Sequence, residues 1–413
     1  MYQNSPNSLF DIHTYLYIFW REKRIQWGRR TSIFFLKNKL KKPQVSENLK
    51  EIKECLIKKR KTKNANLYLA KEEEILLQQI RIKTNEWNLN NVTRTKAYLD
   101  FYRKFPEIHW AFLGHMVSRN GGWNMTDLRG EMLSRLLNEK TKKDFFAFLE
   151  RGNWLIFQDA YPQFLVYEES MKRNQNLFYL LPFLNISMFM EVMWEHFWQY
   201  RDSYLLAIAL VINEQSYLEK RIVQNPLYKD KVFHTPEFML QDLLSFNHIL
   251  FPFEGKLPGK TAFIGQTLHH FGSLNERILL GKRLYRLLFH NKNQLEKVIS
   301  WAVSHPHTGS RKDYWPDIFN DINEGLPGVG FKRRLKNCQL RKGALRIYSP
   351  RLEYAWKNID HPDAEYGDWF QDWRVINYLQ DQDEKIDGEI THEYCETLKK
   401  LELAALAKKT IFK

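Results

Sequence analysis

The sequence predicts an all-α protein, with a single large multi-helix body behind a basic aromatic N-terminal arm and at most one short hairpin. Three observations predict this class. The 413 residues include only 18 glycines and 14 prolines, too few for a turn-dense β protein. From about residue 67 onward, apolar residues recur at spacings of three and four, as on the packed face of a helix. The longest alternation with the period of a strand covers only residues 345–348, where we expect the hairpin.

The composition and the placement of charge define the domains. Hydrophobic residues make up 44% of the chain and aromatic residues 15%, more than a disordered chain carries. The net charge is +15, but residues 1–65 hold 16 Lys and Arg against 5 Asp and Glu. This arm therefore carries +11, and the body at residues 66–413 carries only +4. Any electrostatic attraction to an anionic partner should come mainly from the arm.

The arm interleaves aromatic rings with cations over residues 8–42. Such a pattern suits a membrane interface or stacking on nucleic acid, and we expect the contact within residues 8–63. It equally suits a helix that packs its rings on the body while its Lys and Arg reach solvent, and charge alone can serve solubility. The cations expected to meet an anionic partner are Arg21, Lys23, Arg24, Arg29 and Arg30 of the arm, and Lys332, Arg333 and Arg334 of the body.

Helix-breaking and capping residues predict where the first helices of the body begin and end. One helical pattern begins near Leu67, and the next crosses a break at Pro106. Gly121-Gly122 is a typical helix end. Asn124, followed three residues later by Asp127, resembles the capping box of another helix.

The middle of the chain is expected to contain several shorter helices. Residues 203–212 are apolar on every side, which predicts a helix buried by its neighbours. Breaks are expected at Gly152-Asn153, Tyr161-Pro162, Leu181-Pro182 and Asn225-Pro226, and further caps at Asp144, Asn185, Asn247 and Ser310.

The C-terminal third changes its charge twice. Residues 331–352 hold eight Lys and Arg and no Asp or Glu, whereas residues 360–390 hold ten Asp and Glu and two Lys and Arg. We expect these neighbours to pair with each other, which weakens the basic stretch as a nucleic-acid site.

Several features indicate a cytoplasmic protein, with the membrane periphery as an alternative position through the arm. Cys55, Cys338 and Cys395 are an odd number without a C-x-x-C pair, which argues against a disulfide framework or a Cys-rich zinc site. The cations near the N-terminus follow the apolar run at residues 15–20 instead of preceding it, the wrong order for a signal peptide. The longest uncharged stretch, residues 174–190, is interrupted by Pro182, so no transmembrane helix is expected.

Two glycine-rich motifs are candidates for phosphate sites. Gly259-Lys260-Thr261 lacks the earlier glycine of a phosphate loop, because position 254 is Glu, and we expect a turn there. Residues 324–334 resemble the hairpin of a helix-hairpin-helix module, whose turn presents amides to a DNA phosphate. Arg334 stands where that module has a small residue, so a helix end followed by a basic helix is the alternative.

The histidines do not form a metal motif. His392-Glu393 lacks a second His four residues later, and the neighbours His269 and His270 would point about 100° apart on a helix. We predict no metal and no cofactor.

Two groups of polar residues inside apolar helices are candidates for catalysis. Glu191 and Glu195 share a helical face, so they need a partner such as Arg201 or another Arg, or else they act as acid or base. The second group lies around Gly121-Gly122. The full candidate set is Glu191, Glu195, His196, His109, Asn120, Asn124 and Asp127.

Three segments carry a resemblance to a known family. They are residues 91–98, residues 106–130 with the core Arg-Asn-Gly-Gly-Trp-Asn-Met-Thr-Asp, and residues 307–316. The chain resembles the uncharacterised YppC-like family of Bacillus relatives over roughly residues 65–380. The resemblance implies a bacterial cytoplasmic context and transfers no activity or catalytic residue.

Two functions remain open from the sequence. The first is a binding protein that contacts an anionic partner through its basic arm, with nucleic acid or an anionic membrane surface as the partner. The second is an enzyme whose pocket is lined by the seven candidate residues, with an unspecified reaction.

Overall fold

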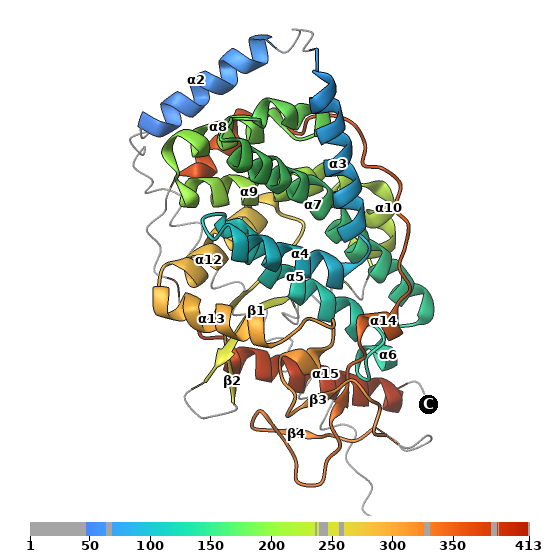
Figure 1. Cartoon of the computed structure of the whole chain (residues 1–413). Coiled ribbons are helices and arrows are strands. Elements are labelled where there is room, and N and C mark those ends of the chain that lie inside the picture. The colour runs from blue at the N-terminus through green and yellow to red at the C-terminus, as the bar shows by residue number, and fades with distance from the viewer. Residues whose placement is uncertain are drawn as a thin grey trace, which may run out of the picture.

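The computed structural model describes residues 47–62, 68–235, 238, 247–255, 260–325, 331–380, 386 and 388–411. Most of these residues are helical and the strands are short (Figure 1), which confirms the predicted all-α class. The division into arm and body stays a prediction, because most of the arm lies outside the described residues. Among the described residues, no helix is both long and apolar enough to cross a membrane.

Of the first three helices of the body, the second and third pack side by side, and the first packs mainly on the later helix α7 (Glu139–Arg173). The three are α3 (Lys71–Trp87), α4 (Asn91–Lys104) and α5 (His109–Asp127). Asn90 caps α4 by accepting the amide N–H of Val92 and Thr93, and the chain breaks around Pro106 as predicted.

Helix α5 continues through Gly121-Gly122, so the predicted helix end and the capping box at Asn124 are wrong. Glycine is present here because neighbouring side chains pack closely on the helix, and not because the chain reverses. A Cβ on Gly122 would lie 2.4 Å from Asn91 Oδ1 and 2.5 Å from His307 Nε2. Glycine is needed there because two side chains press on the helix backbone.

The central helix is α7 (Glu139–Arg173), which is 35 residues long. It runs through Gly152 and Pro162, so the two predicted breaks are wrong, and the expected cap Asp144 lies inside it. Asn138 caps it instead, by accepting the N–H of Thr141. The short α6 (Leu133–Leu136) precedes it.

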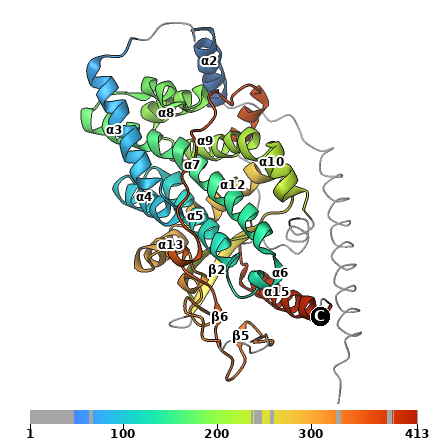
Figure 2. The same cartoon turned by 90° about the vertical axis from the view of Figure 1, so that its right-hand side faces the viewer.

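The buried helix was correctly predicted. Helix α9 (Ser203–Leu218) is enclosed by its neighbours over Leu205–Asn213. It packs against α5, α7, α12 (Leu274–Phe289) and α8 (Met188–Tyr200), and α8 in turn carries α2 (Glu47–Thr62) on its outer side. Figure 2 shows α2 at one end of the molecule in a second view.

The other helical segments connect and cover these layers. Of the four expected caps, only Ser310 caps a helix through its side chain, at η5 (Arg311–Asp313); Asp144 lies inside α7, Asn185 ends η2 (Phe178–Leu184), and Asn247 begins no described helix. The segments are η2 (Phe178–Leu184), η3 (Glu219–Val223), α10 (Pro226–Tyr228), η4 (Lys229–Phe233), α13 (Lys292–Ser304), η5 (Arg311–Asp313), α14 (Leu352–Ala355), η6 (Trp373–Leu379) and α15 (Thr391–Ile411).

The strands differ from the expectation in number and place. The antiparallel pair β1 (His248–Glu254) and β2 (Thr261–Thr267) was not predicted, because β1 reads as a continuous apolar run with little alternation. At the predicted hairpin, β6 (Ile347–Tyr348) instead pairs in parallel with β3 (Phe319–Asn320). A second small hairpin joins β4 (Leu335–Lys336) to β5 (Gln339–Leu340).

The cysteines also correct an expectation. Cys338 and Cys395 form a disulfide across a sequence separation of 57, with their Cα atoms 5.4 Å apart. Cys55 is free and exposed on α2. The odd count therefore reflects one bonded pair and one thiol.

Candidate functional site

The two predicted carboxylates of α8 pair with a lysine of α2, not with an arginine. Lys59 Nζ lies 2.8 Å from Glu195 Oε1 and also contacts Glu191. Burial raises the pKa of Glu191, although the Lys59 ammonium opposes this. Arg201 lies over the Trp198 ring instead. The arrangement holds α2 on α8.

The two candidate histidines lie apart from each other. His196 is on α8 and packs on Tyr200, with ring centroids 4.5 Å apart. His109 begins α5, where its Nδ1 lies 2.8 Å from the Tyr285 hydroxyl and its ring stacks on Phe289. Burial lowers the pKa of both, that of His109 to about 4. The His109 ring is therefore neutral near pH 7.

The candidates on α5 serve different neighbours. Asn120 holds β1, since its side chain donates to the Leu250 carbonyl at 3.0 Å and accepts the Leu250 amide at 2.8 Å. Asn124 is half-buried. Asp127 pairs with Arg311. Five of the seven candidates thus contact separate partners, on α2, α12, β1 and η5, while His196 packs within α8. The joint role of the seven in catalysis stays a prediction.

The structure instead joins the three segments that carry the family resemblance. Asn91 of α4, Ser118 of α5 and His307 meet beside Gly122. His307 Nε2 lies 2.7 Å from Asn91 Oδ1, and Asn91 Nδ2 donates to the Ser118 carbonyl at 2.9 Å. Ser118 Oγ lies 2.7 Å from Thr95 Oγ1. We call Asn91, Thr95, Ser118, Arg119, His307 and Asp313 the α5 polar cluster.

A histidine and a carboxylate face each other at one end of the α5 polar cluster. His307 Nδ1 lies 3.7 Å from Asp313 Oδ2, longer than a hydrogen bond. Burial lowers the pKa of His307. Burial also opposes ionisation of Asp313, but His307 and the Thr308 amide outweigh it and hold the pKa of Asp313 below its ordinary value. A His and carboxylate pair of this kind suits proton transfer. The hydroxyls of Thr95 and Ser118 at the other end of the cluster are buried, however, so they are not exposed to a substrate.

Arg119 is the cation of this cluster, and its side chain is buried. Its Nη1 donates to the His305 carbonyl at 2.6 Å. Its guanidinium lies over the Trp301 ring, 4.6 Å from the centroid, and 5.6 Å from that of Tyr314. The two rings stabilise the buried charge, so the cluster braces α4, α5 and residues 305–314.

Sequence reasoning missed a buried carboxylate in the middle of α7. Asp159 accepts hydrogen bonds from Gln163 and Asn213, and its second oxygen has no partner among the described residues. Burial raises the pKa of Asp159 to about 7, against the hydrogen bond from Asn213. The sequence signal for this carboxylate was its position four residues before Gln163, which places both side chains on the same face of a helix with many apolar residues.

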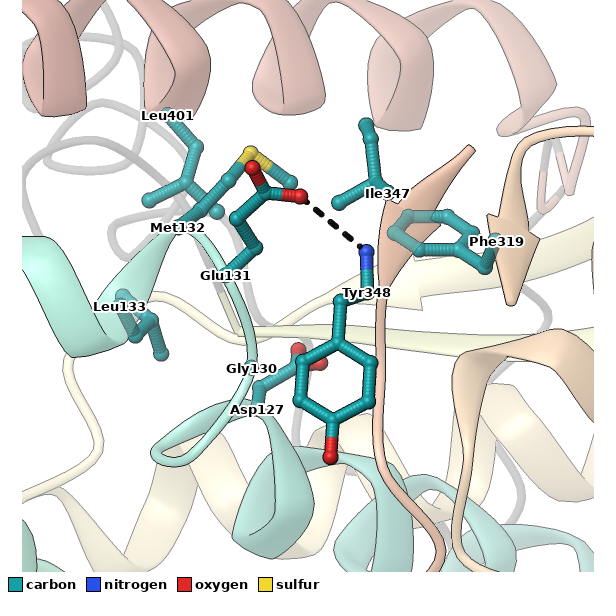
Figure 3. Close-up of a pocket in the computed structure, with 9 residues that line it drawn as sticks. All are labelled: Asp127, Gly130, Glu131, Met132, Leu133, Phe319, Ile347, Tyr348 and Leu401. Atoms are coloured by element: carbon teal, nitrogen blue, oxygen red, sulfur yellow. Dashed lines mark hydrogen bonds between the residues drawn. The ribbon is translucent and has the colours of Figure 1, made fainter. Parts of the chain in front are cut away.

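A small cavity lies beyond the end of α5 (Figure 3). Its lining combines Asp127 and Glu131 with apolar side chains that include Phe319, Ile347 and Leu401. Arg311 donates to Asp127 and to the Tyr394 hydroxyl. Burial raises the pKa of Asp127 to about 6, although Arg311 opposes this. The space is about 10 Å³, room for at most one water molecule, and it is partly open to solvent.

The other carboxylate of the cavity leads to a basic surface. Glu131 accepts the Tyr348 amide at 3.3 Å (Figure 3) and binds Arg334 through both oxygens, at 2.5 and 2.9 Å. Arg334 stands at the base of the β4–β5 hairpin. We call residues 331–342, which contain six Lys and Arg and no Asp or Glu, the basic hairpin.

The basic hairpin lies at the end of the molecule opposite α2 in both views (Figures 1 and 2). Its apolar residues Phe331 and Leu335 are buried. Arg333 Nε is 4.0 Å from Glu402 Oε2. Its exposed cations are Lys332, Arg333, Lys336, Arg341 and Lys342.

Two expectations about this stretch are wrong for the described residues. Residues 331–342 form no helix, because the chain there forms β4 and β5, so neither the second helix of a helix-hairpin-helix module nor a basic helix is present. The acidic residues 360–390 also do not neutralise it, since the carboxylates bound to Arg334, Arg346 and Arg351 are Glu131, Glu324 and Asp321. The arm cations Arg21, Lys23, Arg24, Arg29 and Arg30 lie outside the described residues, as does Gly259.

No metal site was found among the described residues, in which no group of three or more His, Cys, Asp or Glu is arranged to hold an ion. The prediction that the protein uses no metal is not tested by this observation.

Comparison with known proteins gives a family without a known activity. A family model described as "Protein of unknown function (DUF2515)" matches residues 86–395. The "Uncharacterized protein YppC" of Bacillus subtilis (strain 168) is 42% identical over 238 residues, which are 58% of this chain and 72% of that protein. No solved structure matches the chain.

Proposed function

This chain belongs to the DUF2515 family of proteins of unknown function, as the YppC-like resemblance predicted, and on that premise we propose that it is a binding protein for an anionic partner. The partner that fits best is the phosphate backbone of nucleic acid. We include in the proposal the cytoplasmic location and the participation of the basic arm.

One observation carries the proposal: the basic hairpin exposes a group of cations for which the fold supplies little compensating charge. Lys332, Lys336, Arg341 and Lys342 are exposed and form no ion pair with a described carboxylate. Cations held on a projecting element can approach a phosphate backbone without distorting the body.

The exposed side chains of the basic hairpin favour nucleic acid over a membrane. A membrane-surface element needs apolar side chains that enter the lipid boundary. Here Phe331 and Leu335 are buried in the protein, and the exposed tip carries Lys336, Asn337 and Gln339.

The test is a charge reversal with a matched control. Four Glu replacements at Lys332, Lys336, Arg341 and Lys342 should weaken binding of a fluorescein-labelled single-stranded DNA about tenfold or more at low salt. The control reverses four other exposed lysines, Lys71, Lys140, Lys292 and Lys297, and gives the same net charge.

Position, not total charge, should decide the result. Equal losses in the two variants, or no DNA binding by the unmodified protein, would contradict the proposal. Retention on anionic vesicles in place of DNA would favour the membrane as partner.

One observation favours an enzyme as the alternative function. Asp127 lines a cavity with its pKa raised to about 6 by burial, as a general acid or base requires. Whether Glu191, Glu195, His196, His109, Asn120 and Asn124 take part stays a prediction. An Asp127→Asn variant that lost a turnover shown by the unmodified protein, while keeping its fold, would support this alternative.

A further inference from the structure

The basic hairpin is too small to hold its own shape. Strands β4 and β5 have two residues each, and the turn between them consists of Asn337 and Cys338. Isolated two-stranded hairpins are at best marginally stable in water. The positions of its cations therefore depend on what fastens the hairpin to the body.

The hydrogen bonds and the ion pair that fasten its base to the body come from the first strand and the residue before it, and Leu340 of the second strand packs against the core. Leu335 is buried, and Glu402 of α15 accepts the amides of Arg334 and Leu335, at 2.5 and 3.3 Å. The Arg334 side chain is bound by Glu131. At the tip, the attachment is the disulfide from Cys338 to Cys395 of α15.

The backbone gives independent evidence that this cysteine has a specific role. Asn337 and Cys338 have φ angles of 49° and 62°. Two-residue turns with positive φ at both positions prefer Asn followed by Gly, because a side chain at the second position is disfavoured. Cysteine at this position costs turn stability, and the bond to α15 offsets that cost.

We infer that the Cys338–Cys395 disulfide is a redox-controlled clasp that fixes the basic hairpin for binding and releases its tip when reduced. The inference rests on the proposed function. It adds a regulation of the same surface, namely control of DNA binding by the redox state of the disulfide.

Access to the two sulfurs favours attack at the hairpin. Cys338 is half-buried and Cys395 is buried. A thiolate of a dithiol reductant attacks Cys338 Sγ, forms a mixed disulfide, and releases the Cys395 thiolate, which takes up a proton. The second thiol of the reductant loses its proton and displaces Cys338 as a thiol. Two electrons and two protons pass to the protein, and the reductant leaves as its disulfide.

Release of the tip should weaken binding because the partner must then order the hairpin. The cations on both sides of the turn, Lys336 and Arg341, lose their fixed separation. The free-energy cost of ordering the hairpin is then subtracted from the free energy of binding. We expect single-stranded DNA to bind about three- to tenfold more weakly to the reduced protein.

The experiment uses the full chain with Cys55→Ser, because Cys55 is an exposed thiol. The protein is equilibrated with the dithiol dithiothreitol and its oxidised form at increasing ratios of reduced to oxidised reagent, and the disulfide fraction is measured by maleimide labelling. Affinity for fluorescein-labelled DNA and hydrogen exchange of the amides at residues 335–340 are measured in the same samples. The control is a Cys395→Ser variant in the same background, which cannot form the bond.

The inference predicts that reduction speeds amide exchange at the hairpin and weakens DNA binding, and that Cys395→Ser matches the reduced protein in every buffer. Equal exchange and equal affinity in the oxidised and reduced forms would overturn it. So would failure of the disulfide to form in oxidising buffer. Faster exchange on reduction, with no DNA binding in either form, would support the clasp and refute the proposed function alone.

Discussion

Replacement of Gly122 by Ala tests the packing of the α5 polar cluster. In an ordinary helix interior this substitution stabilises by about 1 kcal/mol, because alanine has the higher helix propensity. At this position the new Cβ would lie 2.4 Å from Asn91 Oδ1 and 2.5 Å from His307 Nε2. These two atoms form the partly buried 2.7 Å hydrogen bond that joins α4 to residues 305–314.

The magnitude follows from three contributions. Overpacking costs about 1–3 kcal/mol, and separation of a buried hydrogen-bonded pair costs about 1–3 kcal/mol. With the gain in helix propensity of about 1 kcal/mol subtracted, Gly122→Ala should lower the free energy of unfolding by about 1–5 kcal/mol, with a central value near 3 kcal/mol.

The assay is urea unfolding followed by tryptophan fluorescence and circular dichroism. The matched control is Gly152→Ala in α7, where a new Cβ would meet no atom within 4 Å. The control should raise the free energy of unfolding by about 0.5–1 kcal/mol. A Gly122→Ala variant as stable as the control would refute the described contact between Asn91, His307 and the helix backbone.

Three further predictions concern the core, the disulfide and the arm. Burial raises the pKa of Asp159 from 3.8 to about 7, so the unfolded chain loses this proton at lower pH and stability should fall as pH rises from about 4 to 7. Asp159→Asn should remove up to about 4 kcal/mol of that pH dependence, as seen in urea unfolding at several pH values, and an unchanged profile would contradict it. Replacement of Cys338 and Cys395 by Ser should lower the free energy of unfolding by up to about 4 kcal/mol for a loop of this length, and equal denaturation midpoints with and without the bond would oppose this. Deletion of residues 1–46 keeps α2 on α8 and should reduce DNA affinity at low salt, whereas unchanged affinity would exclude the arm from binding.

The helical class could be predicted from local sequence, but the helix boundaries could not. The apolar run at residues 203–212 has no polar face, and this alone required a buried helix. Gly121-Gly122 and Tyr161-Pro162 looked like helix ends by their local preferences. They lie inside α5 and α7 because neighbouring segments distant in sequence pack against them, which no local pattern records.

The candidate site was predictable in part for the same reason. Glu191 and Glu195 were identified as needing a cationic partner, but Lys59 could not be chosen, because it lies on a helix more than 130 residues away in sequence. The family segments at residues 91–98 and 307–316 were noticed as strings, and only the fold brings Asn91 and His307 together. The count of three cysteines gave no pairing, and the bond depends on the β4–β5 turn lying beside α15.

The salt dependence of DNA binding tests the central claim most directly. For each phosphate of a single strand that the protein no longer neutralises, the slope of log affinity against log salt concentration becomes shallower by about 0.7. The account predicts that charge reversal at Lys332, Lys336, Arg341 and Lys342 makes this slope shallower by about 3, while the matched reversal at Lys71, Lys140, Lys292 and Lys297 leaves it nearly unchanged. Equal slopes in the unmodified protein and the hairpin variant would contradict the account.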